Sequence, residues 1–168
     1  MSLSMYQASV PVLIRALSNL GNVLAKGQAH AQAHATDEAN YLAMRLVPDM
    51  LPFATQVRIA TDVAKRGVAR LAAIEPPVHA DDETDFTGLI ARCHSVVAFL
   101  NTITPDQVDG SEDRPITLPT PRGEMNFTGQ PFLFGFVLSN VHFHSTMVYA
   151  LLRGIGVELG KTDYLGAS

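Results

Sequence analysis

Four segments of the chain carry apolar residues at the three- and four-residue spacing of an α-helix. The spacing predicts helices over about residues 4–29, 49–73, 84–103 and 130–153. Each predicted helix has one apolar stripe and one polar face, so each needs neighbours to cover the stripe. The pattern is therefore typical of an all-α protein built as a four-helix bundle.

One segment between the third and fourth predicted helices has a different pattern. Ile116 and Leu118 alternate with polar residues, as do Met125 and Phe127, and residues 119–123 supply proline and glycine between the two runs. We expect a short β-hairpin here, laid across the bundle in the crossover before the last helix. The chain has no internal repeat, so residues 1–168 are expected to fold as a single domain.

The remaining polar segments are interpreted as connections and caps. Residues 27–40 contain His30 and His34 at a spacing of four, but their Ala- and Gln-rich surroundings favour a solvated connection with a weak helical turn. An acidic cluster precedes the third helix, where carboxylates suit free N–H groups and the positive end of the helix dipole; it consists of Asp81, Asp82, Glu83 and Asp85. Cys93 falls on the apolar stripe of that helix and is expected to be a buried, unreactive thiol.

Composition limits the classes of function. The chain has 47% hydrophobic and 17% charged residues, a net charge of -4, and scattered Lys and Arg, which argues against nucleic-acid binding. We find no apolar run near the roughly 18–20 residues that cross a membrane. Arg15 interrupts the apolar N-terminal stretch, which is not typical of a signal peptide. We expect a soluble, cytoplasmic protein that binds no nucleic acid and no membrane.

The last predicted helix contains the most notable chemistry, in the stretch LSNVHFHSTMVYALLRGIG over residues 138–156. At about 100° per residue, His142 falls on the polar face while His144 falls on the apolar stripe. The two histidines therefore point in nearly opposite directions and cannot form a shared site. Asn140 and His144, four residues apart, lie on the same face, which is expected to be buried. The stripe consists of Leu133, Val137, Asn140, His144, Met147 and Leu151.

Two interpretations of Asn140 and His144 remain open. An unsatisfied buried polar group costs about 1–3 kcal/mol, so each needs a partner. In the first, they are a core pair, satisfied by each other, by water or by the second helix, where Gln56 could reach the same cavity. Alternatively, they are metal ligands that face a carboxylate, for which Asp49 at the start of the second helix is the best candidate. An Asp beside Pro48 is also an ordinary helix cap.

Four stretches of the chain resemble an uncharacterised bacterial family, a domain-of-unknown-function group within the DinB-like superfamily. They are MSLSMYQASVPVLIRALSNL, RLVPDMLPFATQVRIATD, TGQPFLFGFVLSNVHFH and GVELGKTDYLG. The resemblance covers nearly the whole chain. It implies a DinB-like four-helix bundle with a long crossover that contains the hairpin-like segment, and often a homodimer.

The resemblance also implies a site. The wider superfamily resembles metal-dependent proteins, including thiol-dependent transferases and isomerases, with one His on the second helix and an H-x-x-x-H on the last. Aligned on the LLR at 151–153, His144 takes the place of the second His of that motif, Asn140 replaces the first, and Asp49 or a neighbour replaces the helix-two His. Such a set would hold one divalent ion weakly, with zinc, nickel or manganese as the candidates.

Two hypotheses of function follow. In the first, the protein is a degenerate metal-dependent hydrolase or thiol transferase, whose ion lies between the second and fourth helices and lowers the pKa of water or a thiol. In the second, it is a metal-free, homodimeric binding or stress-related bundle without catalytic activity, with a small molecule as a possible ligand. The sequence leaves open whether the chain is an enzyme.

Overall fold

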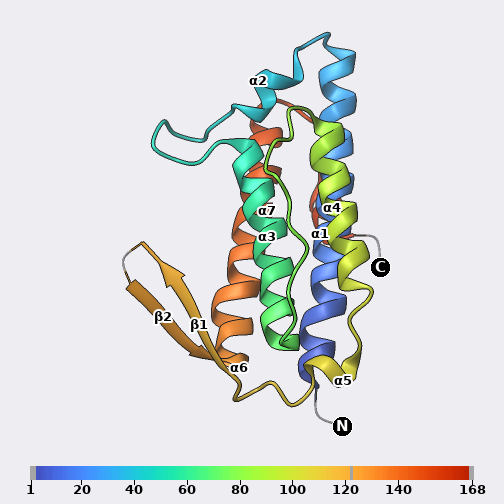
Figure 1. Ribbon diagram of the computed structural model, residues 1–168. Helices are drawn as coiled ribbons and strands as arrows, with labels where there is room; N and C mark the ends of the chain where they lie inside the picture. The colour runs from blue at the N-terminus through green and yellow to red at the C-terminus, as the bar shows by residue number, and fades with distance from the viewer. Residues whose placement is uncertain (1–2, 122, 167–168) are drawn as a thin grey trace.

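Four long helices form the bundle in the computed structural model, which describes residues 3–121 and 123–166 (Figure 1). α1 packs mainly against α4, and α3 packs mainly against α7. One continuous apolar core lies between them. The all-α bundle expected from the spacing of apolar residues is confirmed, with helices α1 (Met5–Ala33), α3 (Phe53–Ala72), α4 (Phe86–Leu100) and α7 (Ser139–Gly154).

The β-hairpin in the crossover is also confirmed. Strands β1 (Pro115–Thr120) and β2 (Gly123–Thr128) pair antiparallel, with Ile116 opposite Phe127. The hairpin projects from one end of the bundle instead of lying across it (Figure 1). Arg122 in its turn lies outside the described residues.

Shorter helices occupy the connections, namely α2 (Glu38–Leu42), α5 (Pro105–Val108) and α8 (Lys161–Leu165). α1 itself is longer than predicted, because residues 30–33, expected in a connection, continue the helix. Ala31 is buried there, and the Nδ1 atom of His30 lies 2.8 Å from the hydroxyl of Tyr41. These tertiary contacts favour helix where the local composition suggested a solvated connection.

α1 has the length and the composition of a membrane-crossing helix, contrary to the expectation that no apolar run was long enough. In the structure, 56% of its most apolar window is buried inside the bundle. Burial of this kind is expected of a core helix in a soluble domain, whose apolar face is covered by protein. The cytoplasmic location stays a prediction.

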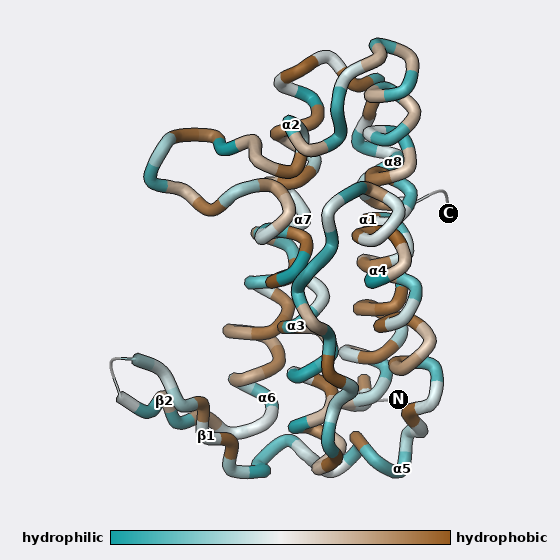
Figure 2. The backbone as a smooth tube through the Cα atoms, turned by 45° about the horizontal axis from the view of Figure 1, so that its top comes forward, coloured by the Kyte–Doolittle hydropathy of each residue, from teal (hydrophilic) through white to brown (hydrophobic). Residues whose placement is uncertain are grey.

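The second long helix starts later than predicted, and this corrects the position of Asp49. α3 begins at Phe53, with Pro52 in an extended conformation at its N-cap. Asp49 therefore caps no helix and lies exposed in a turn. Two prolines, at 48 and 52, disfavour helical backbone at the residues before them. Residues 44–52 form a projecting loop that contains hydrophobic segments (Figures 1 and 2).

The last helical segment is continuous but changes its winding. A short α-helix, α6 (Gly129–Pro131), leads into a π-helix, η1 (Phe132–Leu138), which leads into α7. A π-helix takes more residues per turn than an α-helix, so it rotates the residues that follow. The buried positions include Leu133, Val137, Val141, Val148 and Leu152. Val141 therefore takes the core position that the regular spacing assigned to Asn140.

The acidic cluster before α4 has a different role from the one predicted. Asp85 does cap the helix, since its Oδ1 accepts a hydrogen bond from the Gly88 N–H at 2.7 Å. Glu83 instead accepts from the buried Arg92 guanidinium at 2.8 Å, and Asp81 lies 2.6 Å from the same nitrogen. Asp62 of α3 binds Arg92 from the other side, at 2.7 Å. The carboxylates thus neutralise a buried arginine between α3 and α4.

We predict that Gly67→Ala destabilises the bundle by about 1–3 kcal/mol, because overpacking forces the helices apart. A Cβ atom at Gly67 would lie 2.7 Å from Cγ2 of Val137. Urea unfolding measures the loss. The double variant Gly67→Ala/Val137→Ala should recover part of it, whereas Gly154→Ala, with no neighbour within 4 Å, should be neutral. Equal effects at Gly67 and Gly154 would contradict the close contact.

The acidic residues around Arg92 should also make stability depend on pH. Burial by itself raises the pKa of Glu83, but hydrogen bonds from Arg92 and Arg58 outweigh it, so the pKa of Glu83 is lowered. A carboxyl whose pKa is lowered by folding stabilises the protein above its ordinary pKa, and this contribution is lost as the pH falls. We expect Arg58→Met to cost about 1–3 kcal/mol at neutral pH. Between about pH 5 and pH 3, the variant should lose less stability than the wild type in urea titrations.

Candidate functional site

His144 lies on the buried face of α7 and contacts α3. Its Nδ1 atom is 2.6 Å from Oε1 of Gln56, and Nε2 of Gln56 donates a hydrogen bond to the Leu51 carbonyl at 3.0 Å. Because the amide nitrogen of Gln56 serves Leu51, its oxygen must accept from His144. The imidazole proton therefore lies on Nδ1, and Nε2 of His144 keeps its lone pair.

The surroundings of His144 favour the neutral form. Burial lowers the pKa of its imidazole, and the side chain is 8% exposed. A neutral imidazole, oriented by a hydrogen bond at one nitrogen, is the arrangement that supports metal ligation or base catalysis at the other. His144 and Gln56 are therefore brought together between α3 and α7, as the sequence allowed.

Asn140 has a local partner. It is half-buried, and its Nδ2 atom donates a hydrogen bond to the carbonyl of Phe136 at 2.7 Å. This carbonyl belongs to the π-helical turn just before α7. Asn140 thus satisfies backbone within its own helical segment, and Val141 occupies the core position beside it.

The residues expected to hold a metal do not fit that role together. Asp49 is exposed on the projecting loop, whereas His144 is buried against Gln56, and burial by itself accounts for the lowered pKa of His144. Within residues 3–121 and 123–166, no three His, Cys, Asp or Glu side chains are grouped to hold a metal ion. The late start of α3 and the π-helical turn each remove one expected ligand from the site.

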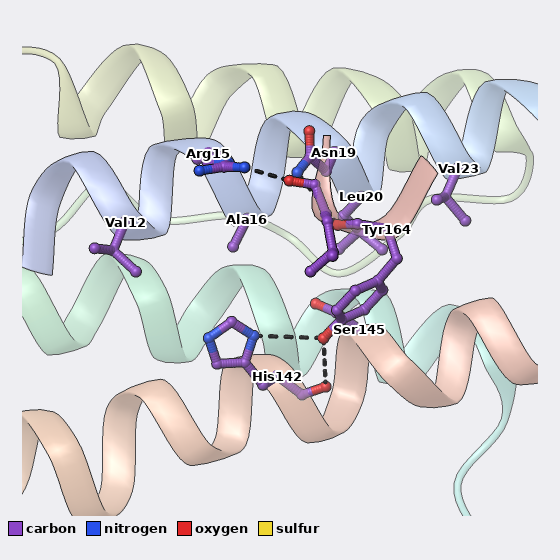
Figure 3. A pocket seen from close by; sticks show the side chains of 10 residues that line it. Val12, Arg15, Ala16, Asn19, Leu20, Val23, His142, Ser145 and Tyr164 are labelled. Carbon is purple, nitrogen blue, oxygen red and sulfur yellow. Dashed lines mark hydrogen bonds between the residues drawn. The ribbon is translucent and has the colours of Figure 1, made fainter. Parts of the chain in front are cut away.

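The neighbouring residue, Ser145, faces a cavity that the sequence did not indicate. The cavity has a volume of about 270 Å³ and lies between α1, α7 and α8 (Figure 3). Apolar side chains of α1 line one wall, and Ser145 and His142 of α7 line another. The α1 residues are Val12, Ala16, Leu20 and Val23. Ser145 is 5% exposed, and its Oγ atom has no hydrogen-bond partner in the described part of the chain.

The short helix α8 closes one side of this cavity. Nε of Arg15 donates to the Leu165 carbonyl at 3.1 Å, and Nδ2 of Asn19 donates to the Tyr164 carbonyl at 3.2 Å. The Tyr164 hydroxyl reaches α7, where it donates to the backbone carbonyl of His142 at 3.3 Å (Figure 3). These bonds tie α8 to both long helices.

A second polar cluster joins Lys65, His79 and Ser95, but its proton arrangement does not suit nucleophilic catalysis. Nζ of Lys65 lies 2.7 Å from Nδ1 of His79, and Nε2 of His79 lies 3.2 Å from Oγ of Ser95. An ammonium group only donates, so Nδ1 must accept and Nε2 must carry the proton. His79 therefore donates to Ser95 and cannot take its proton. The cluster ties residues 74–85 to α3 and α4.

Sequence reasoning missed Ser145 and the cavity beside it. Ser145 directly follows His144, and Arg15 had been noted merely as a charge within an apolar stretch. A small polar residue next to the apolar stripe was the available signal. That signal indicates a cavity only together with the position of α8, which folds back over α1 and encloses the space.

Comparison with known proteins agrees with the fold and names no activity. Residues 5–165 match the model of a family described as a domain of unknown function, DUF1993. A crystal structure of a DinB family member protein from Shewanella denitrificans is 35% identical, with a TM-score of 0.88. The match covers 97% of this chain and 92% of that chain. No protein with a curated description matches the chain.

We predict that His144→Ala lowers the free energy of unfolding by about 1–3 kcal/mol, because it leaves the side-chain amide oxygen of Gln56 buried without its donor. It should not change the response to zinc, nickel or manganese. Urea unfolding of tag-free protein, with and without each ion, measures both effects. His94→Ala, at an exposed position on α4, is the matched control. A metal-induced stabilisation that is lost in His144→Ala and kept in His94→Ala would favour the metal-dependent hypothesis.

Proposed function

The chain belongs to the DUF1993 family of DinB-like proteins, and we propose that it is a binding protein for a small molecule. The proposed site is the cavity between α1, α7 and α8. The ligand would be largely apolar and would carry at least one hydrogen-bonding group. This is the metal-free, non-catalytic alternative among the two functions that the sequence suggested.

The observation that carries the proposal is the unpartnered hydroxyl of Ser145. A buried hydroxyl without a partner costs about 1–3 kcal/mol, and most buried polar groups in proteins avoid that cost. Ser145 is one of the residues that line a cavity whose volume, about 270 Å³, is near the lower end of ligand pockets. A ligand with a donor or acceptor at its inner end would supply the missing hydrogen bond.

The remaining walls suit such a ligand. The side chains from α1 provide apolar contact, while Arg15 and Tyr164 add polar groups on the side of α8. The Arg15 guanidinium donates from Nε to the Leu165 carbonyl. Its terminal nitrogens have no partner among the described residues and are available to solvent or a ligand. A few polar groups in a mostly apolar lining are typical of small-molecule sites.

The metal-dependent hydrolase or thiol transferase has less support. His144 offers one oriented imidazole nitrogen, but no carboxylate contributes to its pKa, and Asn140 is bound to its own helix. A catalytic zinc site normally has three protein ligands. The homodimer implied by the resemblance stays a prediction.

We predict that neutral aromatic probes bind the cavity and that filling it abolishes binding. Indole and phenol, followed by ligand-observed NMR and thermal shift, should bind the wild type but not Ala16→Leu or Ser145→Val. Ala150→Leu adds the same volume at an exposed position of α7 and should bind like the wild type. Ser145→Ala should be as stable as the wild type or about 1 kcal/mol more stable, since it removes an unsatisfied hydroxyl.

Two outcomes would contradict the proposal. One is that neither probe binds the wild type. The other is that Ala16→Leu and Ala150→Leu bind the probes equally well. A clear loss of stability in Ser145→Ala would show that the hydroxyl already has a partner in solution, and this too would remove the main support.

A further inference from the structure

A second hollow lies between α3 and the hairpin, and the proposed function does not use it. It is a groove of about 540 Å³. Its α3 wall carries Arg58, Arg66 and Arg70, and its opposite wall carries apolar residues of the hairpin and of η1. Two carboxylates, Asp62 and Asp81, also line the groove, and both form ion pairs with the buried Arg92. Because a positively charged wall faces an apolar one, the groove favours a ligand that has both an anionic group and an apolar group.

The positive charge of the α3 wall is incompletely neutralised. Arg58 binds Glu83 at 2.7 Å, and Arg66 binds Asp62 at 3.3 Å. Arg70 has no carboxylate within ion-pair distance among the described residues; its Nη1 atom donates to the Arg66 carbonyl at 3.4 Å. Burial and the neighbouring charge of Arg66 lower the pKa of Arg70, although Glu75 partly opposes this. An anion beside Arg66 and Arg70 would relieve the repulsion between them.

The opposite wall is aromatic. The rings of Phe132 and Phe136 stack with centroids 5.6 Å apart and an interplanar angle of 13°. Phe127 of β2 packs against both rings. Met125 lines the groove with 43% of its surface exposed, and a thioether makes favourable contacts with aromatic rings. A planar apolar group fits this wall better than a second polar one.

We propose that the groove binds an aromatic molecule that carries an oxyanion, either a phosphate or a carboxylate. The oxyanion lies at Arg66 and Arg70, which are one helical turn apart and can each bind it through two N–H groups. The ring lies against Met125 and Phe136. The site is separate from the cavity beside Ser145, which is lined by α1, α7 and α8.

Fluorescence titration of the full chain with 1-naphthyl phosphate and 1-naphthoate tests the proposal. The chain contains no Trp, so the naphthyl signal is free of tryptophan background. We expect saturable binding that weakens with added salt, because the contact is partly ionic. Arg70→Gln should weaken binding about tenfold, a typical size for one charge-assisted contact. Met125→Ala should weaken it less. Tighter binding of one probe supports the proposal and identifies the anionic group.

Three controls make the result decisive. Lys161→Gln removes one exposed positive charge outside the groove and should bind like the wild type. In the Ala16→Leu variant, whose other cavity is filled, neutral 1-naphthalenemethanol should bind more weakly than either anion. Ala16→Leu should keep binding of the naphthyl anions, since it blocks the other cavity. Circular dichroism melting of each variant confirms that it is folded.

The proposal is overturned if neither anion binds the wild type. It is also overturned if Arg70→Gln and Lys161→Gln bind the anions equally, or if the neutral alcohol binds the Ala16→Leu variant as well as the anions do. Loss of anion binding in Ala16→Leu, with binding kept in Arg70→Gln, would place the probes in the cavity between α1, α7 and α8. That result would overturn the groove and leave the function proposed above intact.

Discussion

Val137 packs directly over Gly67, and this contact sets how α3 and α7 meet. A Cβ atom at Gly67 would come within 2.7 Å of the valine, so glycine is what lets the two helices approach. The contact also fixes the rotation of the last helix, because Val137 lies in the π-helical turn that precedes α7. From that rotation it follows that His144 meets Gln56 while Ser145 turns towards α1.

Two adjacent buried polar residues of α7, His144 and Ser145, differ in whether they have a hydrogen-bond partner. His144 is satisfied by a side chain of α3, which in turn binds backbone at Leu51. Ser145 has no such partner within the described residues, although it is equally buried. Burial without a partner is costly, whereas burial with one is nearly neutral. The histidine is therefore accounted for by the fold, whereas the Ser145 hydroxyl is the observation on which the proposed ligand rests.

Between α3 and α4, a buried charged residue likewise depends on its partners. Arg92 is almost fully buried, and three carboxylates converge on it from α3 and from residues 81–83. Removing one member of such a cluster leaves a buried charge without its partner, which is strongly destabilising. Residues 74–85 are consequently held against the bundle. Where α3 meets the hairpin, Arg70 lacks a carboxylate partner in the described chain, and the groove there keeps an uncompensated positive charge.

The sequence by itself determined the four helices and the hairpin, because the spacing of residues such as Leu89, Cys93 and Ile116 is a local property of the chain. It also placed His144 on a buried face and identified Gln56 as a residue that could reach the same cavity. Only the tertiary structure decided that Asn140 leaves the core and that Asp49 lies on an exposed loop, since a π-helical turn and two prolines shift both. The ion pair between Asp62 and Arg92 and the cavity beside Ser145 depend on segments far apart in sequence. Periodicity carries no information on which of those segments meet.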